Sequence, residues 1–358
     1  MSLGKFPTVT VADARIERER IKAGRRDGID PANQRRQAKA IAAVAAENTF
    51  AAVAKEWASK QQHAPSTSSK LEWVFDTILN PGIGMRPIGE VSAPELLAVL
   101  RRVESRGKLE TAQRAKQYAG LVFRYAIATG RADRDPAADL KGALATPKTR
   151  HRSSLTAPMT IAPLLRAIDG CEGSAVVAAA LRLAPLVFVR PGELRGAEWR
   201  EFDFDAAEWR IPAERMKGRM GERVPHLVPL SSQSIAILRE LQPVTGRGRY
   251  VFPSVRTGSK PISENTLNAA LRRLGFTAEE MTAHGFRSMA STRLHEMGWP
   301  HAAIERQLAH VPRDKVSAAY NYAEHLPERR KMMQAWADYL DRLRDGGNVI
   351  AGSFGRVA

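Results

Sequence analysis

Six residues in the second half of the chain have side chains suited to an attack on a phosphodiester. They are Arg190, Lys217, His284, Arg287, His310 and Tyr320. The planar guanidinium of arginine can neutralise two phosphate oxygens at once, and lysine or histidine can pass a proton to the leaving oxygen. Tyrosine can act as the nucleophile when neighbouring cations favour its phenolate. Together these residue types could cut a phosphodiester with a side chain as the attacking group.

Arg190 separates a long apolar run, Val176–Val189, from a Pro191-Gly192 turn. An arginine next to so much apolar material is costly unless it pairs with another group, and Glu193 is a candidate partner one turn later. The stretch fits a phosphate-binding arginine that leaves the core for a cleft. It fits a purely structural Arg190–Glu193 pair equally well.

His284 and Arg287 are three residues apart, so they share one face of a helix near its N-terminus, where the helix dipole favours an anion. A helix-start histidine beside a surface arginine would give the same spacing. His310 follows Leu308-Ala309 at an expected helix end, shortly before Pro312. A histidine that only caps carbonyl groups is the alternative there.

Lys217 falls at the tip of an expected β-hairpin, where a single lysine is usually just solvated. Arg219 and Arg223 lie on the same segment and compete with Lys217 for a catalytic role. Tyr320 and Tyr322 are similarly close, so one could be the nucleophile and the other could be packed.

The composition favours a nucleic-acid partner. The 358 residues include 55 Lys and Arg against 38 Asp and Glu, a formal charge of +17. Cys171 is the single cysteine, so no disulfide framework or cysteine-based zinc site is expected. The start lacks a secretory signal, and the run Val176–Val189 is too short to span a bilayer. We therefore expect a cytoplasmic protein with no membrane partner.

Apolar periodicity divides the chain into residues 1–47, 48–147, 152–345 and 346–358, with a basic linker near 148–152. The first part is basic and poor in large apolar residues, and it predicts helices over Val11–Ala23 and from Pro31 to about Ala46. The last part is expected to be a flexible tail.

Residues 48–147 contain four amphipathic stripes, which predict a compact helical bundle. Ser92 and Glu95 form a capping-box pattern at the third stripe. The apolar positions are Phe50, Val53, Trp57; Leu71, Val74, Phe75, Ile78; Leu96, Val99, Leu100, Val103; and Tyr118, Leu121, Val122, Tyr125.

Residues 152–345 predict a mainly helical domain with one small sheet. Two short strands, Trp209–Pro212 and His226–Leu230, would form a hairpin whose basic tip is Arg215–Gly221. Helices are expected over Ser232–Leu241, Ser263–Leu274, His284–Met297, Pro300–Leu308, Lys315–Tyr322 and Pro327–Leu343.

The order of these residues resembles the tyrosine recombinases, the phage integrase family, over about residues 7–345. The subgroup with the most similar sequence motifs is that of prophage and genomic-island integrases related to those of satellite phages. The stretches that carry the resemblance are Val189–Arg195, Arg215–Lys217, His226–Ser231, His284–Arg287, Leu308–His310, Ala319–Asn321 and Glu328–Gln334.

The resemblance implies that Arg190 and Arg287 clamp the scissile phosphate and that Lys217 is the general acid for the departing 5′ oxygen. It gives Glu193 a supporting role. The hairpin segment from Lys217 is longer than is usual in the family, which leaves Arg219 and Arg223 open as substitutes.

For the remaining residues, the resemblance implies that His284 and His310 supply hydrogen bonds and proton transfer. Tyr320, ten residues after His310 within Ala-Tyr-Asn, would form a covalent 3′-phosphotyrosyl link. The link conserves the bond energy, so no ATP, cofactor or metal ion is expected.

By the same resemblance, the protein would be a site-specific recombinase that integrates or excises a prophage or genomic island. Residues 48–147 and 152–345 would be the core-type DNA-binding and catalytic domains. Residues 1–47 would hold only the end of an arm-binding domain and connector helices. The expected partners are double-stranded DNA at core sites, further copies of the chain in a tetramer, and accessory DNA-bending or directionality proteins.

Three other functions fit parts of the sequence. A metal-dependent nuclease could use Glu198, Glu201, Asp203 and Asp205, although this stretch is more typical of a turn between a helix and a strand. A non-catalytic DNA-binding relic of a prophage would share the composition. A type IB topoisomerase would share the chemistry without site-specific exchange.

Overall fold

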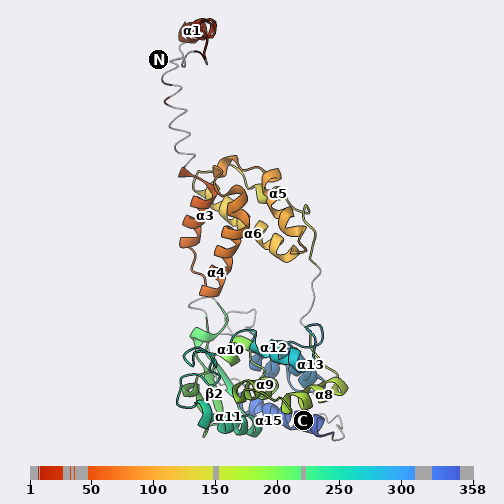
Figure 1. Ribbon diagram of the computed structural model, residues 1–358. Coiled ribbons are helices and arrows are strands. Elements are labelled where there is room, and N and C mark those ends of the chain that lie inside the picture. The colour runs from red at the N-terminus through yellow and green to blue at the C-terminus, as the bar shows by residue number, and fades with distance from the viewer. Residues whose placement is uncertain are drawn as a thin grey trace. The chain divides into compact units, whose positions relative to one another are not determined.

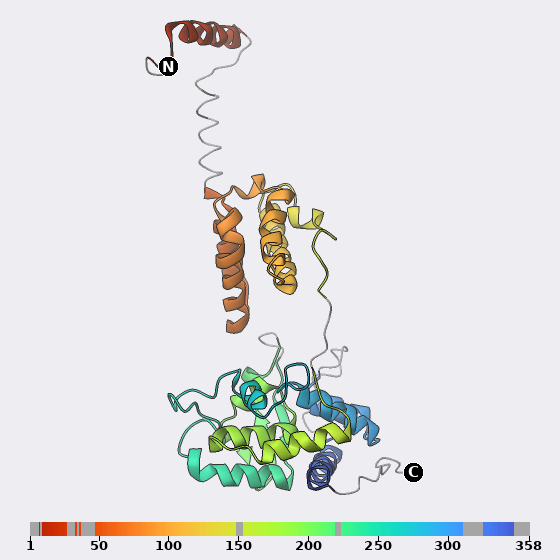
Figure 2. The same ribbon diagram turned by 45° about the vertical axis from the view of Figure 1, so that its right-hand side comes forward.

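The computed structural model describes residues 7, 9–26, 33, 36, 47–147, 153–218, 223–310 and 325–346. It divides into two compact units, residues 1–149 and 150–358, and each has its own apolar core (Figures 1 and 2). The helix expected over 315–322, most of the one over 31–46 and nearly all of the tail lie outside the described residues. No described helix is long and apolar enough to cross a membrane.

The described part of the first unit contains helices joined by turns and loops and no strand beyond an isolated bridge, and its main helices follow the four predicted stripes. Thr49 caps α3 through its side chain, and Ser92 and Glu95 form the predicted capping box at α5. The elements are α1 (Val11–Arg26), α3 (Phe50–Ser59), α4 (Pro65–Val74), the π-helical η1 (Phe75–Gly84), the 3₁₀ turn η2 (Ile88–Glu90), α5 (Ala93–Glu104), α6 (Leu109–Ala128) and α7 (Pro136–Asp139).

The second predicted stripe differs from the expected regular helix. It begins as α4 and widens into η1 at Phe75, with Pro81 inside the π-helical segment. Proline removes a backbone donor and disturbs the helical ladder, which gives a local reason for the change. Phe75 still points into the core, where its ring makes edge contacts with the rings of Phe50 and Trp57.

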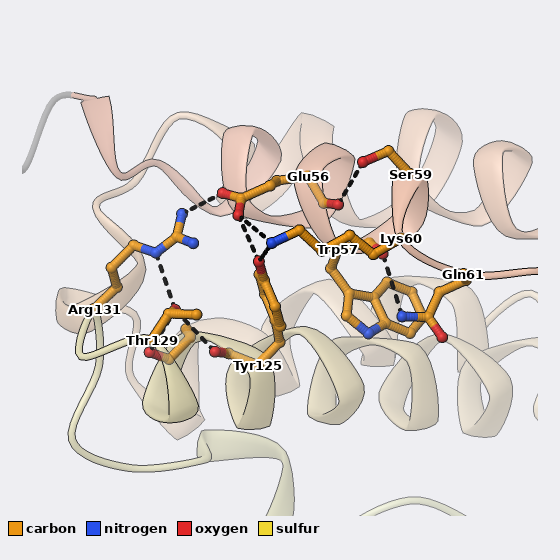
Figure 3. Close-up of polar contacts among 9 residues, drawn as sticks. Glu56, Trp57, Ser59, Lys60, Gln61, Tyr125, Thr129 and Arg131 are labelled. Carbon is orange, nitrogen blue, oxygen red and sulfur yellow. Dashed lines mark hydrogen bonds and ion pairs between the residues drawn. The ribbon is translucent and has the colours of Figure 1, made fainter.

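A cluster of polar side chains joins α3 to α6 at the surface of the first unit (Figure 3). Glu56 accepts hydrogen bonds from Arg131 at 2.7 Å, from Lys60 at 3.1 Å and from the hydroxyl of Tyr125. The bonds from Arg131, Tyr125 and Lys60 lower the pKa of Glu56 to about 2. We call these four residues the surface cluster. Each of its charges has a partner within the cluster.

In the second unit the helices pack around α9 (Ala175–Val187), an almost wholly apolar helix. It contacts α8, α10, α11, α12, α13 and α15, and Figures 1 and 2 show it in the middle of the unit. These helices are α8 (Pro158–Asp169), α10 (Pro191–Arg195), α11 (Ser232–Thr245), α12 (Thr266–Arg273), α13 (Gly285–Glu296) and α15 (Leu326–Asp345); α14 (His301–Gln307) packs on α13 and α15.

The predicted hairpin is present, as part of a three-stranded antiparallel sheet in the order β1-β2-β3. Strand β2 (Glu208–Ile211) pairs with β3 (His226–Pro229), with Trp209 opposite Val228. The expectation of two strands missed β1 (Phe202–Asp203), which is only two residues long and follows the 3₁₀ turn η3 (Trp199–Glu201). The mainly helical class with a small sheet is confirmed.

The prediction that Arg215 belongs to the basic tip of the hairpin is wrong. Arg215 ends the 3₁₀ turn η4 (Ala213–Arg215), and its guanidinium binds the Glu201 carboxylate and the backbone carbonyl of Glu193. Glu201 also accepts a hydrogen bond from the buried Trp209 indole. Because both Glu201 and Trp209 are buried, this arginine neutralises an interior carboxylate and is unavailable at the tip.

Candidate functional site

Arg190 is held at the point where the apolar helix α9 ends. Phe188 ends α9 in the left-handed conformation, with φ at 36°, and this reverses the chain so that Arg190 becomes the N-cap of α10. Glu193 accepts hydrogen bonds from the backbone N–H of Arg190 and from its Nη1, both at 2.8 Å. The Glu193 carboxylate is buried, so it holds the Arg190 guanidinium from the interior of the protein.

Arg287 lies in the first turn of α13, whose N-cap is His284. This turn is packed tightly by the residues that open the second unit: Ser154 donates to the Gly285 carbonyl at 2.8 Å. A Cβ at Gly285 would lie 2.5 Å from the Ser153 carbonyl oxygen. A glycine is therefore required between the two candidate residues, for reasons of space.

Three successive carbonyl groups at the end of α14 accept hydrogen bonds from side chains of other elements. The ring of His226 donates to the carbonyl of residue 307 at 3.1 Å, Arg287 Nη2 to that of 308 at 2.6 Å, and Arg190 Nη2 to that of 309 at 3.1 Å. The last carbonyls of a helix lack partners within it and carry its partial negative charge. The end of α14 therefore holds both candidate arginines together, and we call Arg190 and Arg287 the arginine pair.

The arginine pair concentrates positive charge in a buried place. Arg287 is 5% exposed, and burial together with the charge of Arg190 lowers its pKa to about 10, against the opposing influence of Glu193 and Glu305. At neutral pH the Arg287 guanidinium therefore stays charged beside Arg190. Their repulsion falls when an anion binds between them, so the pair is suited to a phosphate group.

His226 is a neutral component of the same arrangement. It is buried, and desolvation first, with the charges of Arg329, Arg306 and Arg287, moves its pKa well below 6.5. Beside it, the buried Arg329 of α15 donates to the side-chain oxygen of Gln307. Helix α14 is thus attached to β3 and to α15 as well as to the arginine pair.

His310 follows α14 through a Schellman turn. The backbone N–H of Ala309 donates to the carbonyl of residue 306 and that of His310 to the carbonyl of Glu305, each at 3.1 Å. Ala309 has a φ of 49°, a left-handed conformation usually taken by glycine. The His310 ring then lies between Glu305, 2.8 Å from Nδ1, and Arg287, whose Nη2 is 3.4 Å from Nε2. It does not simply cap carbonyls.

Lys217 is exposed, next to η4. Within the described part of the chain, its ammonium group makes no hydrogen bond to the arginine pair. Its competitor Arg223 donates to the carbonyls of Gly218 and Glu214, at 3.0 and 2.9 Å, so this guanidinium is tied to the backbone on both sides of Lys217. Arg219 lies outside the described residues.

Tyr320 and Tyr322 also lie outside the described residues, so their interpretation rests on the sequence. The structure brings Arg190, Arg287 and His310 together, and it places His284 on the same helical turn as Arg287. It leaves Lys217 without a described contact to them.

The carboxylates proposed for a metal-dependent nuclease do not converge. Glu201 is bound by Arg215 and Trp209, and Glu198 pairs with Arg249 and Arg200. Within the described ranges, no three His, Cys, Asp or Glu side chains are grouped as metal ligands. Glu198 and Glu201 are instead engaged by arginine and tryptophan side chains of the second unit.

Sequence reasoning missed two contributors, Glu305 and His226. Glu305 could have been found from its position five residues before His310, because a Schellman turn joins residues at this spacing. The ring of His226 meets α14 across 81 positions of sequence, and no local pattern indicates such a contact.

Three family models match the chain. The "Phage integrase family" model covers residues 158–328, the "Phage integrase central domain" model residues 50–143, and the "Arm DNA-binding domain" model residues 1–38. The first contains the arginine pair, and the second covers the helical bundle.

Curated relatives resemble nearly the whole chain. The integrase of Enterobacteria phage P4 is 40% identical over 96% of this chain and 81% of its own length. The integrase of Shigella phage Sf6 is 37% identical over 95% of this chain and 86% of its own. Prophage integrase IntS of Escherichia coli is 36% identical, also over 95% and 86%.

Solved structures share the fold at lower identity. A lambda integrase tetramer bound to a Holliday junction matches with a TM-score of 0.58 and 17% identity, covering 88% of this chain and 90% of that one. The Tn1549 transposon integrase in complex with transposon right end DNA matches with a TM-score of 0.60 and 14% identity, covering 78% and 99%.

Proposed function

This chain belongs to the phage integrase family as a tyrosine-type site-specific DNA recombinase, and we propose that Tyr320 cuts each DNA strand from within the site built around Arg190 and Arg287. The contact of both arginines with the end of α14, beside His310, is the observation that carries this proposal. Two guanidinium groups and an imidazole that lie this close together are suited to bind one phosphate group.

In the cleavage step, the Tyr320 oxygen attacks the phosphorus and the bond from phosphorus to the 5′ oxygen breaks. The products are a 3′-phosphotyrosyl link and a free 5′ hydroxyl. Arg190 and Arg287 bind the non-bridging oxygens as negative charge builds on them. The reverse attack by a 5′ hydroxyl of the partner strand rejoins the DNA and releases Tyr320.

Proton transfer falls to Lys217 and the two histidines. Lys217 gives a proton to the departing 5′ oxygen, and its exposed position leaves it able to approach DNA. The engagement of Arg223 with backbone carbonyls favours Lys217 over that residue. His284 donates a hydrogen bond to the phosphate, and the His310 imidazole accepts the proton that the Tyr320 hydroxyl loses as it attacks.

The partners in this proposal are double-stranded DNA carrying core sites and three further copies of the chain. The charge of +17 and the match to structures of lambda integrase on DNA, as a dimer and as a tetramer, support it. Residues 1–38, which match the arm DNA-binding domain model, would contact separate arm sites, with accessory DNA-bending or directionality proteins. The biological outcome would be integration or excision of a prophage or genomic island.

Covalent capture tests the proposal. Wild-type protein is incubated with sheared genomic DNA of the organism that carries the gene, and protein-linked fragments are isolated in detergent and sequenced. The recovered core site is then built into a nicked suicide substrate. We expect an adduct that forms equally in EDTA, is absent with Tyr320→Phe and persists with Tyr322→Phe.

Three results would overturn parts of this proposal. No adduct from the wild type would remove the covalent mechanism and leave a DNA-binding relic. Cleavage that stops in EDTA and leaves no protein on the DNA would indicate a metal-dependent nuclease. An adduct that survives Tyr320→Phe but not Tyr322→Phe would move the nucleophile.

A further inference from the structure

The end of α14 brings the side chain of Glu305 next to His310. The Schellman turn returns the chain so that the His310 N–H bonds the Glu305 carbonyl at 3.1 Å, and the two side chains then meet on the same side of the turn. Glu305 Oε2 lies 2.8 Å from His310 Nδ1. Backbone and side chain thus link the same two residues.

The two neighbours of the imidazole assign its protons. An ionised carboxylate only accepts hydrogen bonds, so Nδ1 carries a proton and donates a hydrogen bond to Glu305. A guanidinium only donates, so Nε2 offers its lone pair to Arg287 Nη2, 3.4 Å away. Both contacts require the same neutral tautomer, with the proton on Nδ1.

We propose that Glu305 is a positioning residue for DNA cleavage, which fixes the tautomer and the ring orientation of His310 so that Nε2 faces the scissile phosphate. The inference rests on the proposed function, in which His310 acts at that phosphate. Glu305 itself touches neither DNA nor the reacting atoms. It acts through the imidazole, as a carboxylate behind a functional histidine does in other sites.

A purely structural ion pair at a helix end is the competing explanation. The side chains of His310 and Glu305 are 48% and 33% exposed, and ion pairs this open to solvent contribute little to stability. Such a pair would not depend on which ring nitrogen carries the proton. The two explanations therefore differ for Glu305→Gln, which keeps the size of the side chain but can donate to Nδ1 and so permit the other tautomer.

Single-turnover cleavage of the nicked suicide substrate tests the inference. We expect Glu305→Gln to slow adduct formation about 10- to 100-fold, while the Kd for core-site DNA and the urea midpoint of unfolding stay at wild-type values. On a His310→Ala background, Glu305→Gln should cost nothing further, because its effect passes through the ring. Glu296→Gln, which removes the charge of an exposed glutamate paired with Arg293 at the far end of α13, is the matched control.

A second measurement reads the tautomer without activity. With histidine labelled by ¹⁵N, long-range NMR correlations report which ring nitrogen of His310 is protonated at a pH where the ring is neutral. The wild type should show Nδ1–H, and Glu305→Gln should shift His310 toward Nε2–H. This arm remains informative even if no adduct forms, so a failure of the proposed function is distinguishable from a failure of this inference.

The inference is overturned if Glu305→Gln cleaves at the wild-type rate. It is also overturned if Glu305→Gln lowers the cleavage rate as much in the His310→Ala variant as in the wild type. An unchanged His310 tautomer in Glu305→Gln would also overturn it. A slow variant with a shifted tautomer and normal DNA affinity supports it.

Discussion

The surface cluster and the arginine pair are built from similar groups, but they differ in how much of their positive charge is neutralised by neighbouring carboxylates. In the surface cluster, the half-exposed carboxylate of Glu56 accepts hydrogen bonds from Arg131, Lys60 and Tyr125, so each charged group has a partner of opposite charge within the cluster. In the second unit, one buried carboxylate, Glu193, serves Arg190, and backbone carbonyls hold the remaining donors. Carbonyl groups orient a guanidinium without cancelling its charge. The first arrangement stabilises a helix pair, and the second keeps net positive charge ready for an anion.

The largest expected contrast is in cleavage. Arg287→Lys keeps a charge but loses the fork that reaches the carbonyls of Phe188 and Leu308, so single-turnover cleavage should fall about 100- to 1000-fold. Arg131→Lys in the surface cluster should change it less than about threefold. Equal losses in the two variants would remove the functional distinction between the regions.

The carboxylates should differ next, in stability. Glu193→Ala leaves Arg190 largely buried without its partner, and the free energy of unfolding should fall by about 2–4 kcal/mol. Glu56→Ala breaks contacts open to solvent and should lower the urea midpoint much less. Urea unfolding of both variants at pH 7.5 measures the difference. A larger effect at Glu56 would reverse the comparison.

The two regions should also lose stability in different pH ranges. The pKa of His226 is lower in the folded than in the unfolded protein, so its contribution is present above about pH 6.5 and declines below it, by at most about 1.4 kcal/mol per pH unit. His226→Gln should remove this part of the slope between pH 7 and 5.5 in urea unfolding. The lowered pKa of Glu56 acts further down, from 4.5 to about 2. Identical slopes in wild type and His226→Gln would contradict the assignment.

The smallest effect concerns Ala309, whose carbonyl binds Arg190. Glycine adopts its left-handed conformation without the Cβ penalty, so Ala309→Gly should raise the free energy of unfolding by up to about 1 kcal/mol, net of chain entropy. Cleavage should stay near the wild-type rate. A destabilised variant would show that the alanine methyl group contributes packing that outweighs the strain.

Local sequence patterns predicted most of the helices and the hairpin of the fold. The Ser92–Glu95 capping box, the stripe around Phe50 and Trp57, and the hairpin at Trp209 follow from spacing, and the structure confirms them. The π-helical turn after Phe75 was not foreseen, because an amphipathic stripe does not report hydrogen-bond pitch. Arg215 was misplaced because its partner Glu201 is fixed by tertiary packing.

The candidate site divides in the same way. The Arg190–Glu193 pair follows from a three-residue spacing. The bonds from Arg287 to Phe188 and from Arg190 to Ala309 span 99 and 119 positions, beyond any local pattern. The left-handed conformation of Phe188 could not be predicted from the sequence, because aromatic residues rarely adopt it.

The carbonyl contacts at the end of α14 also bear on when the protein can act. They mean that the two guanidinium groups reach their places only after α9, α13 and α14 have docked together. A chain that is still being synthesised, or one in which α14 has opened locally, lacks an assembled phosphate site. In the proposed function, assembly of the fold would therefore act as a safeguard, because a partly folded copy would bind DNA through its positive charge without cutting it.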